Sequence, residues 1–94
     1  MIRVIINRYF AEGMRENLLA LQTKTRQNAI FSAGYISGES LQDMDDPQHN
    51  IVISSWRSKR DWEIWYSSSA RKELAAEIAP MLDQPETITV FEIS

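Results

Sequence analysis

The chain has 94 residues, of which 44% are hydrophobic, and its net charge is −3. This length allows one domain over residues 1–94, and this composition excludes a disordered chain. The negative charge gives no electrostatic reason to bind nucleic acid or an anionic membrane. Without cysteine the chain has no disulfide, no thiolate nucleophile and no Cys-based metal site.

The first ten residues read MIRVIINRYF, an apolar run interrupted by Arg3, Asn7 and Arg8. They have no small-residue cleavage pattern, so we do not expect a signal peptide. No segment of the chain approaches the roughly 20 apolar residues of a membrane span. The expected location is cytoplasmic.

Residues 2–10 are predicted to form a strand because β-branched side chains dominate them. Apolar side chains occupy both faces of this strand: Ile2, Val4 and Ile6 on one, Ile5 and Tyr9 on the other. A strand with one face in water would alternate more regularly between apolar and polar residues.

Residues 12–28 predict an amphipathic helix with Met14, Leu18 and Leu21 on its apolar side. A second strand follows at residues 33–41, where Gly38 indicates a bulge or a close backbone approach. The polar turn at residues 42–49 is too short for a parallel crossover. The third strand, residues 50–57, is therefore expected to form a hairpin with the second.

Ser58 is a candidate N-cap of the next helix, which carries Trp62, Trp65 and Tyr66 on one face. The serines at 67–69 predict a kink or a restart, after which residues 70–82 continue the helix. Pro80 lies inside the apolar stripe of that segment, so its last turn is expected to be distorted. Residues 86–93 predict a fourth strand that is again apolar on both faces.

The predicted element order is β-α-β-β-α-β, which is the order of a ferredoxin-like α+β domain with both helices on one side of an antiparallel sheet. Two helices cover only one face of four strands, whereas several strands are apolar on both faces. We therefore expect a second copy of the chain to cover the open face, giving a homodimer. The alternative is a monomer with an apolar open face.

Asn7 is the first candidate for a functional residue. Asparagine is disfavoured in the middle of a strand, and an amide in an apolar cavity would need a ligand or another polar partner. The alternative, which the sequence alone favours, is an edge-strand asparagine bonded to backbone or water.

Aromatic residues are the second group of candidates. Trp56, Trp62 and Trp65 could line a pocket for a flat aromatic ligand, with Tyr66 beside Trp65 and with Tyr35 as a phenol donor. Core packing is the more common role for any one of them.

Histidine chemistry is limited because His49 is the only histidine, and it lies in the polar segment before the third strand. The chain has no HExxH motif, no GxGxxG motif and no P-loop. A metal site and a serine triad therefore have no support, and we expect no cofactor and no metal.

The segments INRYF, GYISGESL and ISSWRSKRDWEIWYSSSARKEL resemble the antibiotic-biosynthesis-monooxygenase family over essentially the whole chain. The most specific part is the W-x-S-x-x-x-W-x-x-W block from Trp56 to Trp65. The resemblance implies a dimeric α+β barrel with a cavity between sheet and helices. It also implies that Asn7 and Trp65 are catalytic, with Tyr35, Trp62 and Tyr66 as pocket residues.

Known activities of that family include the oxidation of anthrone- or quinol-like aromatics by molecular oxygen without metal or flavin. A related branch degrades haem with an asparagine, a tryptophan and an iron-binding histidine, but the histidine position corresponds to Ala75 here. The resemblance thus implies a cofactor-independent monooxygenase acting on a small aromatic hydroxyl compound. The alternative is a non-enzymatic binding or regulatory module of the same fold.

Overall fold

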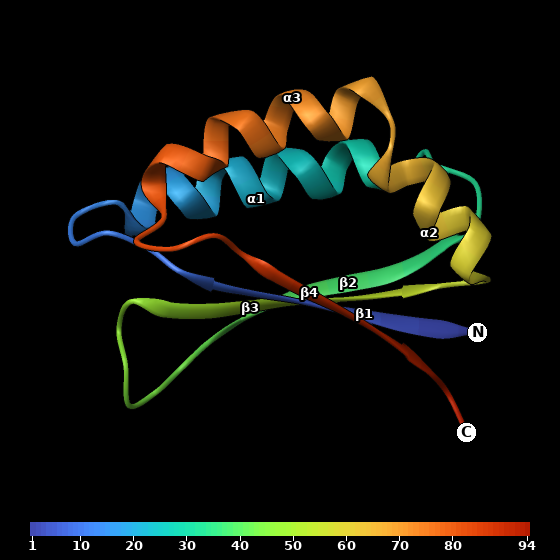
Figure 1. The fold of residues 1–94 in the computed structure, drawn as a ribbon, viewed down its shortest axis with the longest axis horizontal. Helices are drawn as coiled ribbons and strands as arrows, with labels where there is room; N and C mark the ends of the chain where they lie inside the picture. The colour runs from blue at the N-terminus through green and yellow to red at the C-terminus, as the bar shows by residue number, and fades with distance from the viewer.

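The computed structural model describes residues 1–94 and contains four strands, three α-helices and one 3₁₀ turn. In chain order these are β1 (Ile2–Tyr9), α1 (Arg15–Ala29), β2 (Tyr35–Gln42), β3 (His49–Trp56), α2 (Lys59–Tyr66), α3 (Ser69–Ile78), η1 (Ala79–Met81) and β4 (Thr87–Glu92). All helices lie on one side of the sheet, and no element covers the other side (Figure 1). No helix is long and apolar enough to cross a membrane.

The sheet order is β2-β3-β1-β4, and every neighbouring pair is antiparallel. This confirms the predicted ferredoxin-like α+β fold. The hairpin of β2 and β3 is also confirmed. Its bulge lies between Tyr35 and Ser37 rather than at Gly38, whereas Gly38 is the site of a close approach by the Tyr35 side chain.

The first helix begins three residues later than predicted. Gly13 has φ +84°, a backbone conformation that favours glycine, so the turn after β1 must finish before helical geometry starts. Met14 occupies the N-cap position of α1 without a side-chain hydrogen bond.

The predicted break in the second helical region is confirmed. Ser67 ends α2, and the Ser68 hydroxyl then caps α3 by accepting a hydrogen bond from the Arg71 backbone N–H. The predicted distortion near Pro80 is also confirmed, because the chain tightens there into η1. Two short helices therefore stand where the sequence predicts one interrupted helix.

The two faces of β1 differ in what they contact. Ile2, Val4 and Ile6 point toward the helices and form the main core together with Trp56 and other apolar residues. Because side chains alternate along a strand, the odd-numbered residues of β1 point to the open face. The register between β1 and β3 puts Ile51 and Ile53 on that face as well.

Candidate functional site

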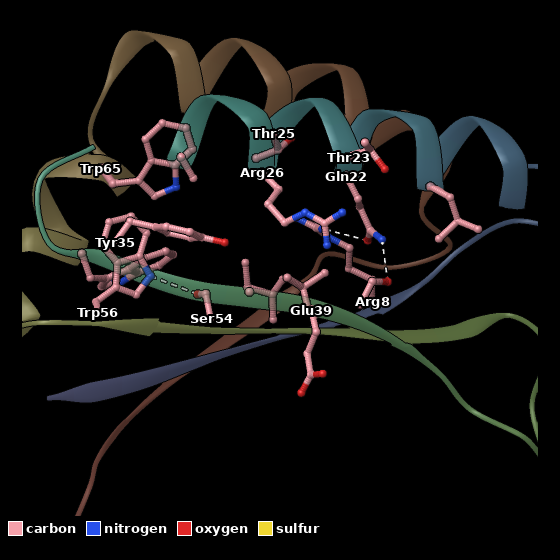
Figure 2. Close-up of a pocket in the computed structure, with 17 residues that line it drawn as sticks. Arg8, Gln22, Thr23, Thr25, Arg26, Tyr35, Glu39, Ser54, Trp56 and Trp65 are labelled. Atoms are coloured by element: carbon pink, nitrogen blue, oxygen red, sulfur yellow. Dashed lines mark hydrogen bonds between the residues drawn. The ribbon is translucent and has the colours of Figure 1, made fainter. Parts of the chain in front are cut away.

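A cavity of about 290 Å³ lies between the helices and the sheet. Its walls come from β1, α1, β2, β3 and α2, and Figure 2 shows side chains of these elements converging on it. The volume is close to the lower end of the range for small-molecule sites. One end of the cavity is aromatic and the other is polar.

The aromatic end contains all three tryptophans of the chain. Trp56 stacks on Trp65 at 6.4 Å between ring centroids and meets Trp62 and Tyr35 edge-on at 5.8 and 5.3 Å. The Trp56 indole N–H donates to the Ser54 hydroxyl at 3.0 Å, so its polar atom is satisfied. These rings are mostly buried and packed against one another, and together they form an aromatic wall for a flat ligand.

The start of α2 fixes where Trp62 and Trp65 lie. The Ser58 hydroxyl accepts a hydrogen bond from the Asp61 backbone N–H, and the Asp61 carboxylate accepts from Ser58 and Arg57. These hydrogen bonds lower the pKa of Asp61 below its usual value, and the bond from Arg57 has the largest effect. The cap therefore anchors the helix that carries two cavity tryptophans.

The polar end is built around Arg8. Its guanidinium donates to Glu86 at 2.7 Å and to Gln22 at 2.8 Å, and Arg71 donates to the other oxygen of Glu86 at 3.1 Å. Burial lowers the pKa of Arg8 from its usual value, while the charge of Glu86 opposes this shift. Two buried arginines thus share one carboxylate, and this cluster keeps a net positive charge.

Tyr35 directs its hydroxyl from the aromatic wall toward the middle of the cavity (Figure 2). Burial raises the pKa of Tyr35, and the positive charge of Arg26 partly offsets the effect. The phenol is therefore protonated at neutral pH and can donate a hydrogen bond to a ligand.

A family model described as antibiotic biosynthesis monooxygenase matches residues 1–77. The chain belongs to this family. No curated protein sequence matches it.

Solved structures with the same fold come from several organisms. A conserved protein from Methanosarcina mazei Go1 superposes with a TM-score of 0.93 at 16% identity, covering 99% of this chain and 92% of that one. Rv0793 from Mycobacterium tuberculosis gives 0.89 at 18% identity, covering 99% and 94%. SnoaB, a cofactor-independent oxygenase from Streptomyces nogalater, gives 0.86 at 12% identity, covering 99% and 93%. At these identities the likeness establishes the fold alone.

Of the residues that the family resemblance implicated, the structure brings Trp65, Trp62 and Tyr35 together in the cavity. It does not bring Asn7 or Tyr66 there. The expectation that Asn7 and Trp65 share one cavity is therefore corrected. Ile6 and Arg8 point into the cavity, so the alternation of the strand places Asn7 on the opposite, open face of the sheet.

On the open face, Asn7 belongs to a separate polar group. Its side-chain oxygen lies within hydrogen-bond distance of His49 Nε2, while His49 Nδ1 is 2.7 Å from Asp43. Tyr9 stacks on the His49 ring at 4.4 Å. The hydrogen bond with His49 is the main reason that the pKa of Asp43 is lowered. His49, expected in a loop, is thus the first residue of β3 and a half-buried member of this group.

Tyr66 lies on the outer side of α2. It is 43% exposed, packs against Trp62 at 5.6 Å and receives the Arg71 guanidinium 4.4 Å above its ring. The expectation that Tyr66 lines the cavity is also corrected, because one helical step of about 100° separates it from the inward-facing Trp65.

Sequence reasoning missed the polar lining of the cavity. Arg8, Gln22 and Arg26 were not among the candidates, although each lines it. The alternation of β1 was the available signal for Arg8, since this residue shares its face with Ile2, Val4 and Ile6. The residues of α1 carried no comparable signal.

Proposed function

We propose that the cavity binds a small, flat aromatic hydroxy compound and that molecular oxygen oxidises this compound there without a cofactor. The observation that carries the proposal is the convergence of all three tryptophans and the Tyr35 hydroxyl on one cavity. Membership of the antibiotic biosynthesis monooxygenase family supports the reaction class, and a cofactor-independent oxygenase with the same fold is a precedent.

The proposed chemistry needs only the substrate and oxygen. A CH₂ group flanked by aromatic rings, as in an anthrone, loses a proton, and the resulting carbanion supplies the electrons that reduce O₂. One oxygen atom forms the new C=O bond, while the other leaves as water with the two hydrogens. The substrate is oxidised and oxygen is reduced, so no external reductant is required.

The chain contributes position and hydrogen bonding to this reaction. Trp56 and Trp65 would hold the ring system by stacking. The protonated Tyr35 hydroxyl would donate a hydrogen bond to the developing oxyanion. Such a donor contributes most where water is excluded, and the surrounding rings are buried.

No base faces the cavity. Glu39 belongs to the lining, but its carboxylate points away from the cavity (Figure 2). His49 lies on the open face of the sheet. A substrate oxidised here would therefore have to give its proton to water.

The lack of a base also favours the second candidate function, a binding or regulatory module that uses the same cavity without catalysis. Ligand binding without oxygen uptake would distinguish this function from oxidation. The aromatic wall serves both functions equally well.

Oxygen uptake by the purified protein with a panel of anthrones and quinols tests the proposal. We expect uptake above the uncatalysed rate, with one O₂ consumed for each anthrone converted to the anthraquinone. Trp65→Ala should abolish this excess, whereas Ile64→Ala, a change at a half-exposed neighbour outside the cavity, should retain it. Equal rates in the wild type and in Trp65→Ala would contradict the proposal.

We also propose that the open sheet face pairs with a second copy of the chain. Ile5, Ile51 and Ile53 form the centre of that face, and Leu41 and Phe91 flank it with 41% and 50% of their surfaces exposed. No helix covers this side (Figure 1). A matching sheet would remove the apolar patch from water.

A further inference from the structure

The charges around the cavity do not balance. The charged residues of its lining are Arg8, Arg26 and Glu39, and the Glu39 carboxylate points away (Figure 2). Arg8 is paired with Glu86, but Glu86 also serves Arg71. The cavity is therefore positive within a chain whose net charge is −3.

Arg26 lines the cavity from a solvent-exposed position and is the cation of the lining that has no ionic partner. It makes no ion pair and no side-chain hydrogen bond in the structure, unlike Arg8, Arg57 and Arg71. The helix offers it no acidic neighbour, because the residues three and four positions away are Thr23, Gln22, Ala29 and Ile30. Its guanidinium comes from α1 toward the space that Arg8 enters from the sheet (Figure 2).

We infer that the cavity binds its aromatic ligand as an anion, with Arg26 contacting the negative charge and the tryptophans contacting the ring. This inference rests on the proposed role of the cavity as a ligand site and names the class of ligand: a flat aromatic that carries a carboxylate or an ionised acidic hydroxyl. Where the charge is that of an ionised hydroxyl conjugated with the reacting carbon, it also accounts for the missing base, since such a substrate enters already deprotonated.

The lining offers contacts for both the charge and the ring of such a ligand. The guanidinium of Arg26 presents a fork of donors that fits two oxygen atoms, and the Tyr35 hydroxyl adds a neutral donor. The guanidinium of Arg8 already donates to Glu86 and Gln22. Arg8 would therefore attract the anion through the net positive charge that it shares with Arg71 and Glu86. The ring would lie against Trp56 and Trp65, where the wall is apolar.

A pair of matched probes tests this inference by calorimetry. 2-Naphthoate and 2-naphthamide have nearly the same shape, but only the first is charged. We expect the wild type to bind 2-naphthoate about tenfold more tightly, the size of effect that one charge-assisted hydrogen-bonded contact provides. High salt should weaken the binding of 2-naphthoate and leave that of 2-naphthamide unchanged.

Three variants of α1 identify the residue responsible. Arg26→Gln should remove the preference for 2-naphthoate and leave the affinity for 2-naphthamide unchanged. Lys24→Gln, which removes one positive charge from the same helix outside the cavity, should keep the preference. Arg26→Lys should keep part of it, because the charge remains and the planar fork is lost.

Three outcomes would overturn the inference. Equal affinity for the two probes in the wild type would leave a ligand site without charge selection. If neither probe binds, the proposed ligand site is contradicted together with its charge selection. An equal loss of preference in both glutamine variants would assign the effect to overall charge. If the preference for 2-naphthoate is intact but no substrate supports oxygen uptake, the inference stands and only the proposed oxidation is contradicted.

Discussion

The hydroxyl oxygen of Tyr35 lies 2.6 Å from the position that a β-carbon on Gly38 would occupy. A β-carbon does not come this close to a non-bonded oxygen, so the phenol keeps this position only because residue 38 has no side chain. Tyr35 and Gly38 belong to the same strand, on either side of the bulge that shifts the register of β2 against β3. The bulge and the glycine together set how far the hydroxyl reaches into the cavity.

Gly38→Ala should displace the Tyr35 ring and narrow the cavity while the fold is retained. We expect the affinity for an aromatic ligand to fall about tenfold or more, as is typical when a donor moves and a cavity shrinks. Calorimetry with 2-naphthoate measures the change. As a control, Gly13→Ala introduces strain at φ +84° in an open turn that does not line the cavity. It should lower the free energy of unfolding by about 1 kcal/mol and leave binding intact.

Glu86→Gln should remove the only anion shared by Arg8 and Arg71. Losing one partner from a buried charge cluster costs about 3 kcal/mol of unfolding free energy, because the other charges stay buried. Since the cavity becomes more positive, saturating 2-naphthoate should restore more stability to this variant than it adds to the wild type. Urea denaturation with and without the ligand measures both effects, and an equal gain in the two proteins would argue against an anion site near Arg8.

Because of the α2 cap, the free energy of unfolding should depend on pH in the acid range. The pKa of Asp61 is below its unfolded value of 3.8, so the folded state holds fewer protons on this carboxyl than the unfolded state does. Its stabilising contribution is complete above pH 3.8 and disappears as the pH falls through the lowered folded-state value. Asp43, whose pKa is lowered by His49, acts in the same direction.

Thermal unfolding between neutral pH and pH 2 tests the role of Asp61. Asp61→Asn should lower the melting temperature at neutral pH and flatten its fall in acid. An unchanged acid dependence in this variant would show that the cap carboxyl does not contribute.

The open sheet face should support a homodimer. Light scattering should give about twice the chain mass of 10.9 kDa. Ile51→Lys puts a charge at the centre of the apolar face and should shift the protein to the monomer, whereas Lys59→Glu at an exposed site on α2 should not. A wild-type monomer at micromolar concentration would contradict the proposed pairing.

The fold was predictable because local signals and hydrophobic patterns agreed along the chain. Ser58 before the tryptophans, the serines at 67–69 and Pro80 each marked an element boundary that the structure confirms. The start of α1 was predicted too early because the sequence does not reveal that Gly13 adopts a positive φ.

The site was predictable only in part. The spacing of Trp62 and Trp65 placed both on one helix face, and both line the cavity. Asn7 was chosen as a polar residue in mid-strand, and the family resemblance added its catalytic role, although the alternation of β1 already placed Arg8 with the core-facing Ile6. The pairing of Arg8 with Glu86 spans 78 positions and depends on the tertiary fold, so no local pattern could reveal it.

The central claim is that ligands bind on the helix side of the sheet and not on the side of Asn7. Titration of ¹⁵N-labelled protein with 2-naphthoate, followed by NMR, tests this most directly. The chain has three indole N–H groups, from Trp56, Trp62 and Trp65, and all belong to cavity residues. We predict that these three signals shift together with saturation while the Asn7 side-chain amide signals stay in place. Shifts confined to Asn7 and the backbone around His49, with unmoved indole signals, would contradict the account.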